Sequence, residues 1–351
     1  MEKRLMKGNE ALAEGAIRAG CKGFFGYPIT PSSEIAEYMA RELPKAGGVF
    51  LQGESEVASI NMVYGAAATG KRIMTASSSP GISLKQEGIS YIAKAELPCL
   101  IVNVSRGGPG LGAIQAGQSD YFQATKGGGH GDYHLIVLAP STVQEMMDFT
   151  MESFDLAEKY RIPVMVMADG TMGQMMEPIY MRDKVEDIPE KPWALTGCKG
   201  RERNVVDTFH PSGEELEEYD KKLAAKYQLV QAQEKRGEAY KTEDADIVVV
   251  SFGLMARIAK KAVEMARAKG VKAGLFRPVT LWPFPSEQLD EAAANAKALL
   301  SVELNQGQMV EDVKLAVNGR VPVHFYGRVS VLPSPEEVME QIVLVAEKEG
   351  K

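Results

Sequence analysis

Four side chains that could bind an anion or move a proton come directly after apolar runs of the chain. They are Thr30, Glu56, Ser79 and Arg106. Each apolar run is expected to be a strand, and the carboxyl ends of neighbouring parallel strands meet at one edge of a sheet, where open α/β sheets bind ligands. Each side chain alone has a purely structural explanation, so only their occurrence together indicates a site.

Glu56 is the strongest candidate for acid–base chemistry. It follows Gln52-Gly53-Glu54-Ser55, where a strand ends and a helix begins, so we expect it in the first helical turn. The helix dipole favours a carboxylate there by about 0.3–1 kcal/mol, and this stabilising role is the alternative to catalysis. Ser59 and Gly65-Ala66-Ala67-Ala68 then form a face of small residues that another backbone or a flat ligand can approach closely. Glu54 is the rival carboxylate.

Arg106 lies in a glycine-rich loop, Asn103-Val104-Ser105-Arg106-Gly107-Gly108-Pro109-Gly110-Leu111-Gly112. The glycines let the backbone turn onto a ligand, and a guanidinium matches a carboxylate. The loop is neither a P-loop nor a Gly-x-Gly-x-x-Gly fingerprint, and Arg106 alone is equally compatible with a salt bridge. Ser79 lies in the segment Thr75-Ala76-Ser77-Ser78-Ser79-Pro80-Gly81, whose hydroxyls are also compatible with helix capping.

Thr30 lies in the turn Gly26-Tyr27-Pro28-Ile29-Thr30-Pro31-Ser32-Ser33-Glu34. An apolar run precedes this turn and an amphipathic run follows it. We therefore expect a strand, a tight turn and a helix, with Thr30 at the N-cap and Pro31 at the first helical position. The two prolines stiffen the turn.

Alternating strands and helices predict an α/β fold with parallel sheets covered on both faces, in two doubly wound domains. We expect domains at residues 1–184 and 244–351, with a connector at 185–243 that carries a long charged helix over 213–239. The second domain is expected to have a supporting or oligomerising role. Strands are expected at 23–27, 49–52, 72–76, 99–104, 135–138, 163–168, 247–251, 273–276, 298–302 and 323–326. Helices are expected at 9–19, from 31, at 55–70, 83–96, 142–159, 254–269, 286–296, 306–317 and 335–347.

The composition narrows the class of protein. The net charge of −7 argues against nucleic acid as the main partner. No apolar run is long enough to span a membrane and no signal peptide is visible, so we expect a cytoplasmic protein without a membrane partner. The three cysteines are widely separated and the four histidines lack metal-ligand spacing, so no metal site is expected on this chain.

Three motifs resemble one family. The turn Tyr27-Pro28-Ile29-Thr30-Pro31-Ser32-Ser33, the segment Glu54-Ser55-Glu56 leading to Gly65-Ala66, and Ser105-Arg106-Gly107-Gly108-Pro109 are similar to those of the alpha subunit of 2-oxoacid:ferredoxin oxidoreductases. The resemblance covers essentially the whole chain. The runs Gln118-Ser119-Asp120-Tyr121-Phe122-Gln123 and Gly127-Gly128-Gly129-His130-Gly131-Asp132 are most similar to the branched-chain (2-oxoisovalerate) type.

The resemblance implies a role for each candidate residue. The first domain would be the pyrimidine-binding domain for thiamine diphosphate, and the second would be like the transketolase C-terminal domain. Glu56 would hydrogen-bond the ring nitrogen of the aminopyrimidine and thereby act catalytically. Thr30 and Arg106 would bind the substrate carboxylate and 2-oxo oxygen. The cofactor pocket would be lined by Tyr27, Pro28, Ile29 and Ser79.

The resemblance also implies partner subunits. The motif that holds magnesium and the diphosphate is missing, since Ala168-Asp169-Gly170-Thr171 is only a fragment of it. Both Mg²⁺ and a [4Fe-4S] cluster are expected on a beta subunit that shares thiamine diphosphate with this chain. Gamma and ferredoxin-like delta subunits, ferredoxin and CoA complete the expected partners, and the chain alone is expected to be inactive.

The implied reaction converts a 2-oxoacid and CoA to acyl-CoA, CO₂ and reduced ferredoxin, in branched-chain amino acid catabolism and anaerobic metabolism. The expected substrate is 2-oxoisovalerate. Two alternatives remain open: a member of the family specific for 2-oxoglutarate or pyruvate, and a non-catalytic assembly subunit that has kept the fold.

Overall fold

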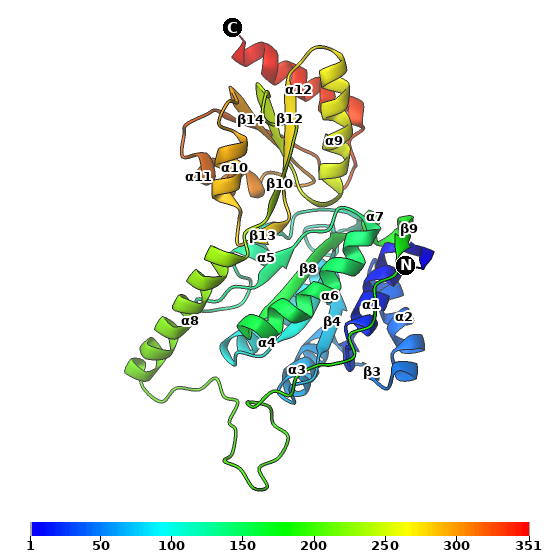
Figure 1. The fold of residues 1–351 in the computed structure, drawn as a ribbon, viewed down its shortest axis with the longest axis vertical. Coiled ribbons are helices and arrows are strands. Elements are labelled where there is room, and N and C mark those ends of the chain that lie inside the picture. Colours follow the sequence, from blue (N-terminus) through cyan, green and yellow to red (C-terminus); the bar gives the residue numbers. More distant parts are fainter. Residues whose placement is uncertain (1, 351) are drawn as a thin grey trace.

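A computed structural model describes residues 2–350. Within this range the chain forms two stacked α/β units, with the helix α8 (Gly213–Gln233) lying alongside (Figure 1). The first unit has a sheet in the order β13-β7-β8-β5-β4-β2-β3, with β6 paired to β5. Its strands are β2 (Gly23–Gly26), β3 (Val49–Gln52), β4 (Ile73–Ser77), β5 (Cys99–Gly107), β6 (Ala113–Ala116), β7 (Ile136–Leu138), β8 (Pro163–Asp169) and β13 (Thr280–Trp282).

The central strands of this sheet are parallel and covered on both faces. All residues of β4, β5 and β8 are buried, which explains their continuous apolar character. The helices of this unit are α1 (Gly8–Arg18), α2 (Ser33–Glu42), α3 (Glu56–Ala67), α4 (Ser79–Lys94), α5 (Tyr121–Thr125), α6 (Val143–Tyr160) and α7 (Gly170–Gln174), with a short 3-10 turn η1 (Pro44–Ala46). Helix α1 packs on α6 and α3 packs on α4. The predicted α/β class with parallel sheets is confirmed.

The second unit has a five-stranded sheet in the order β10-β12-β11-β14-β15. Its strands are β10 (Gly237–Tyr240), β11 (Ile247–Val250), β12 (Ala273–Pro278), β14 (Ala298–Glu303) and β15 (Val323–Gly327). Strands β12, β11, β14 and β15 are parallel, and β10 adds to the edge in antiparallel orientation. The helices are α9 (Gly253–Ala268), α10 (Ser286–Ala292), α11 (Met309–Val317) and α12 (Pro335–Glu349).

Pairs of strands outside this pattern connect distant parts of the chain. Strand β1 (Lys3–Lys7) pairs with β9 (Met176–Tyr180) in a small antiparallel sheet. Strand β13 follows β12 in sequence but pairs with β7 of the first unit. The two units are therefore joined through a shared sheet edge as well as through α8. No helix of residues 2–350 is long and apolar enough to cross a bilayer.

The start of α2 differs from the prediction. The helix begins at Ser33 with Ser32 at its N-cap, so Thr30 is not the N-cap and Pro31 is not the first helical residue. The reason is that Ser32 donates both its backbone N–H and its hydroxyl to the carbonyl of Ile29, at 2.9 and 2.8 Å. These bonds close a separate turn over residues 29–32, in which the Thr30–Pro31 peptide is cis.

The predicted long helix is also shorter than expected. Helix α8 ends at Gln233, and residues 237–240 form β10 instead of a last helical turn. Each of these residues pairs with a residue of β12, from Gly237 with Pro278 to Tyr240 with Leu275. Tertiary pairing therefore overrides a composition that favours a helix.

Candidate functional site

Glu56 lies at the first position of α3, where the structure buries it. The hydroxyl of Ser55 caps this helix by accepting from the backbone N–H of Ala58 at 3.1 Å. Glu56 is 7% exposed, whereas the rival Glu54 is exposed. Within residues 2–350 no hydrogen bond uses the Glu56 carboxylate, so its acceptors are left free at the carboxyl edge of the sheet.

The N-terminal turn of α4 packs directly against this carboxylate. A Cβ atom on Gly81 would lie 2.8 Å from Glu56 Oε1 and 2.1 Å from Ser77 Oγ. Glycine is therefore the residue that fits between the carboxylate and the end of β4. The hydroxyls of Ser77 and Ser78 are buried and have no hydrogen-bond partner within the described chain, so polar groups with unused capacity surround Glu56.

Lys85 lies one turn further along α4 and is fully buried. Its ammonium donates to the backbone carbonyl of Glu56 at 3.4 Å. Burial lowers the pKa of Lys85 to about 8, and the attraction of Glu56 opposes that shift. Nothing in the sequence singles out this residue, because a lysine in a helix normally points to solvent.

Arg106, near the end of β5, is tied to two backbone carbonyls. Its Nη1 donates to Thr30 O at 2.8 Å and its Nη2 donates to Leu111 O at 2.9 Å. The guanidinium thus joins the turn after β2 to the glycine-rich loop. Nε of Arg106 is buried and has no partner within residues 2–350, so this donor is unsatisfied in the described chain.

Ser79 joins Arg106 to a carboxylate that the sequence analysis did not assign. The hydroxyl of Ser79 accepts from the backbone N–H of Arg106 at 3.0 Å and donates to Asp120 Oδ2 at 2.6 Å. The same Asp120 oxygen accepts from Asn103 Nδ2 at 2.8 Å and from Ser105 Oγ at 3.1 Å. Asp120 therefore fixes the ends of β5 and α4 relative to each other. In the sequence, the one feature that points to Asp120 is its place in the run Gln118–Gln123, which resembles the branched-chain type.

A cavity of about 440 Å³ lies beside Ser79 and Asp120 at this edge of the sheet. Residues that precede α11 in the second unit form part of its wall, and Gln308 donates to Ser119 O at 2.7 Å. The second unit thus forms part of the wall of this cavity, and its expected supporting or oligomerising role stays a prediction. The cavity is lined by Ser79, Pro80, Ser83, Gly107, Gly108, Pro109, Gly110, Ser119, Asp120, Gln306, Gln308 and Val329.

The turn after β2 forms the opposite side of Arg106. Asn9 holds this turn by donating to Pro31 O at 2.8 Å. Thr30 is exposed, and no hydrogen bond of the described residues uses its hydroxyl. Tyr27 and Pro28 are exposed and Ile29 is partly exposed, so the residues expected to line a cofactor pocket are accessible.

The structure thus brings the predicted residues together in two linked contacts. Arg106 joins Thr30 and Ser79 directly, and the first turn of α4 joins Ser79 to Glu56 through Gly81.

Asp169 of the incomplete metal motif is buried and accepts from the backbone N–H groups of Thr171 and Met172 at 2.9 and 3.0 Å. It caps α7, and burial raises its pKa to about 6.

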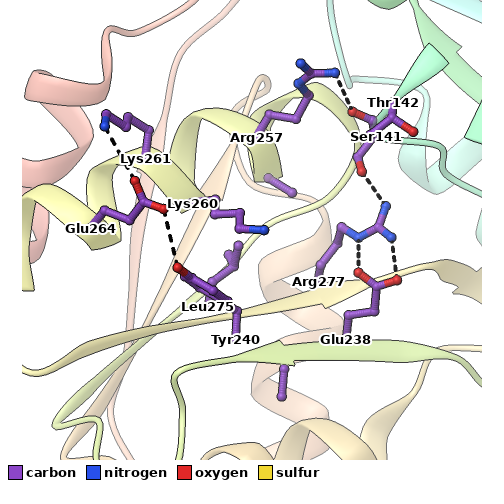
Figure 2. A pocket seen from close by; sticks show the side chains of 12 residues that line it. Ser141, Thr142, Glu238, Tyr240, Arg257, Lys260, Lys261, Glu264, Leu275 and Arg277 are labelled. Atoms are coloured by element: carbon purple, nitrogen blue, oxygen red, sulfur yellow. Dashed lines mark hydrogen bonds and ion pairs between the residues drawn. The ribbon is translucent and has the colours of Figure 1, made fainter. Parts of the chain in front are cut away.

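A second cavity, of about 590 Å³, lies between β10, β12, α9 and the start of α6 (Figure 2). Most of its charged side chains are paired with one another or with neighbours, whereas Lys260 forms no ion pair among the described residues and lies 4.7 Å from the centre of the Tyr240 ring. Arg277 donates to Ser141 Oγ at 2.6 Å and forms an ion pair with Glu238 at 2.8 Å, and Arg257 pairs with Glu177 at 2.7 Å. Because most of these charges are already compensated, we assign the chemistry to the edge that holds Glu56 and Arg106.

No group of three or more potential metal ligands occurs within residues 2–350. Cys21 and Cys99 are buried, and burial raises the pKa of each thiol to about 12. Thiolates are the form that binds iron–sulfur clusters, so these two cysteines are inert core residues. Cys198 is exposed.

Comparison with known proteins identifies the family. The thiamine-diphosphate-binding domain of pyruvate flavodoxin/ferredoxin oxidoreductases matches residues 14–244, and pyruvate:ferredoxin oxidoreductase core domain II matches residues 245–338. The ketoisovalerate oxidoreductase subunit VorB of Methanothermobacter marburgensis is 53% identical over 317 residues, which are 90% of each chain. The 2-oxoglutarate synthase subunit KorA of Methanocaldococcus jannaschii is 41% identical over 371 residues, 98% of this chain and 100% of that one.

Solved structures agree with this assignment. The 2-oxoglutarate:ferredoxin oxidoreductase from Magnetococcus marinus, with 2-oxoglutarate, coenzyme A and succinyl-CoA bound, superimposes with a TM-score of 0.88 at 29% identity. The match covers 99% of this chain and 65% of that chain. A split-gene transketolase, an inactive beta4 tetramer, has a TM-score of 0.60 at 15% identity and supports the fold alone. The chain belongs to the thiamine-diphosphate-dependent 2-oxoacid:ferredoxin oxidoreductase family, of whose enzymes it is one subunit.

Proposed function

We propose that this chain is the alpha subunit of an enzyme that oxidatively decarboxylates 2-oxoisovalerate. The products are an acyl-CoA, CO₂ and reduced ferredoxin. The observation that carries a catalytic role is Glu56 at the first turn of α3, which is 7% exposed and whose carboxylate accepts no hydrogen bond within the described residues. The substrate proposal is supported by 53% identity to a ketoisovalerate oxidoreductase subunit, against 41% to a 2-oxoglutarate synthase subunit.

The residues around Glu56 fit the pyrimidine half of thiamine diphosphate. Gly81 allows the first turn of α4 to pack closely against Glu56 Oε1, and the buried Ser77 hydroxyl beside it lacks a partner in the described chain. When bound, thiamine diphosphate supplies the electron sink that allows a 2-oxoacid to lose CO₂. Glu56 would hold the pyrimidine ring by a hydrogen bond, and Tyr27 to Ile29 would form one wall of the pocket.

The substrate carboxylate and 2-oxo oxygen are proposed to bind at Arg106 and Thr30. Arg106 is held in place by the carbonyls of Thr30 and Leu111 and keeps an unpaired Nε–H. A guanidinium fixed in this way loses little side-chain entropy when it binds a carboxylate. The Thr30 hydroxyl is exposed beside it and supplies a short donor.

A beta subunit is proposed to supply Mg²⁺, the diphosphate site and a [4Fe-4S] cluster, with gamma and delta subunits, CoA and ferredoxin as further partners. The relatives are themselves named as subunits. Large apolar side chains are also exposed around the first turn of α3, a pattern that marks interaction surfaces. They are Tyr27 (39% exposed), Leu51 (41%) and Val57 (45%).

The test replaces Glu56 by Gln in the complex reconstituted with its partner subunits. Turnover of 2-oxoisovalerate, 2-oxoglutarate and pyruvate is followed with a viologen dye as electron acceptor. We expect the wild type to have its highest kcat/KM with 2-oxoisovalerate, and Glu56→Gln to lower kcat at least about 100-fold, the scale of lost acid–base catalysis. Near-normal turnover of the variant would instead favour the non-catalytic assembly subunit, and a preference for another 2-oxoacid would overturn the substrate proposal.

A further inference from the structure

Lys85 is an unusual residue for the middle of a helix. Its side chain is fully buried, and its ammonium donates one hydrogen bond within the described chain, to Glu56 O at 3.4 Å. A buried ammonium with so few partners is costly compared with an apolar side chain of the same length. The stability of the fold alone therefore gives no reason for a lysine here.

The packing of α3 on α4 explains how Lys85 comes to lie beside Glu56. Gly81 precedes Lys85 by four residues and Gly88 follows it by three, so all three lie on one face of α4. A Cβ on Gly88 would lie 2.6 Å from Ile60 Cγ2, and one on Gly81 would lie 2.8 Å from Glu56 Oε1. The two glycines bring the helices close together, and Lys85 is enclosed between them.

The charge of Lys85 depends on Glu56. Burial favours the neutral amine, and the negative charge of Glu56 acts in the opposite direction, which leaves the pKa of Lys85 at about 8. Electrostatic attraction acts on both groups, so the ammonium also pulls on the Glu56 carboxylate. Solvent does not screen this attraction at Lys85, because the side chain is fully buried.

We propose that Lys85 is a positioning residue for Glu56. Its ammonium holds the first turn of α3 through the Glu56 carbonyl, and its charge keeps the carboxylate ready to receive the pyrimidine ring of thiamine diphosphate. This inference rests on the proposed function of Glu56 as the group that binds the cofactor. Lys85 itself does not touch substrate or cofactor and acts through Glu56.

The test compares Lys85→Met with Lys94→Met in the reconstituted complex. Both lysines lie on α4, but Lys94 is at its last turn and pairs with Asp220 at 2.6 Å, away from Glu56. Affinity for thiamine diphosphate is measured by calorimetry, and the melting temperature by scanning calorimetry. Values of kcat and of KM for the 2-oxoacid are then measured at saturating cofactor.

We expect Lys85→Met to weaken cofactor binding about tenfold, the scale of one charge-assisted interaction, and to lower kcat without changing KM. Its melting temperature should equal or exceed that of the wild type, because a buried charge has been removed. Lys94→Met should leave cofactor affinity unchanged. Lys85→Gln, which keeps a donor but not the charge, should also weaken binding.

Two results would overturn the inference. One is wild-type cofactor affinity in Lys85→Met, and the other is a lower affinity that accompanies a lower melting temperature, which would show a structural role. Glu56→Gln in the same titration separates this inference from the proposed function. If Glu56→Gln binds the cofactor as tightly as the wild type does, the proposed role of Glu56 fails. If Glu56→Gln binds it more weakly but the Lys85 variants bind it normally, the role of Glu56 stands and the inference about Lys85 fails.

Discussion

Replacing Gly81 by Ala tests the geometry around Glu56 most directly. The added Cβ would lie 2.1 Å from Ser77 Oγ, 2.8 Å from Glu56 Oε1 and 3.0 Å from Glu56 Cγ. Ser77 has no hydrogen-bond partner in the described chain, so its hydroxyl can rotate away. The Glu56 side chain is confined by burial and must move by several tenths of an ångström.

The effect on stability is a difference between two terms. Alanine is better than glycine inside a helix by up to about 1 kcal/mol, and Gly81 lies in the first turn of α4. Overpacking costs about 1–3 kcal/mol, with about 0.5–1.5 kcal/mol for a strained rotamer. We therefore expect the free energy of unfolding to fall by about 0–3 kcal/mol, while the displaced carboxylate loses cofactor affinity about tenfold or more.

The matched control is Gly213→Ala at the first position of α8, where a Cβ would meet nothing within 4 Å. Denaturant unfolding of both variants and calorimetric titration of thiamine diphosphate into the reconstituted complexes separate stability from site geometry. Gly213→Ala should be as stable as the wild type or slightly more so, with unchanged affinity. Wild-type cofactor affinity in Gly81→Ala would refute the placement of the cofactor against Glu56 and Gly81.

Two further predictions concern Asp169 and Arg106. Burial raises the pKa of Asp169 from 3.8 to about 6 in the folded chain. The protonated Asp169 side chain therefore contributes fully to the free energy of unfolding below about pH 4, and this contribution is lost as the pH rises through about 6. The loss is at most about 3 kcal/mol. Asp169→Asn keeps an acceptor for α7 and should be more stable than the wild type in urea at pH 7.5 but not at pH 4; an equal difference at both pH values would contradict this. Arg106→Ala should raise the KM for the 2-oxoacid about 100-fold, the loss expected for a charge-assisted bond, with cofactor affinity less affected. An unchanged KM would exclude the carboxylate-binding role of Arg106.

The position of Glu56 shows how local sequence predicts where a side chain enters a helix, whereas its preference over Glu54 rests on the resemblance, through the spacing to Gly65-Ala66. The apolar strand and the Ser55 cap fix where α3 begins, so the carboxylate one residue later must enter the first turn. The structure buries Glu56 and leaves Glu54 exposed. Parallel strands, most helices and the sheet edge that carries the site follow from the same short-range patterns.

Contacts between distant segments could not be predicted in this way. Nothing near Asp120 in sequence indicates that Ser79, Asn103 and Ser105 all donate to one of its oxygens. Lys85 looks like a solvent-exposed helical lysine until the packing of α3 on α4 is known. The wrong N-cap at Thr30 has a more local cause, since Ser32 bonds back to Ile29 and delays the helix.

The first turn of α4 connects the two halves of the candidate site. Ser79 accepts from Arg106 N–H at one end of this turn, and Gly81 lies against the Glu56 carboxylate at the other. A shift of α4 would therefore move the groups proposed for substrate and cofactor together. The enclosed Lys85 ties the same helix to α3 through Glu56 O. Because these contacts all lie within one chain, we expect the groups that this chain supplies to the site to be preorganised before a beta subunit adds the diphosphate site.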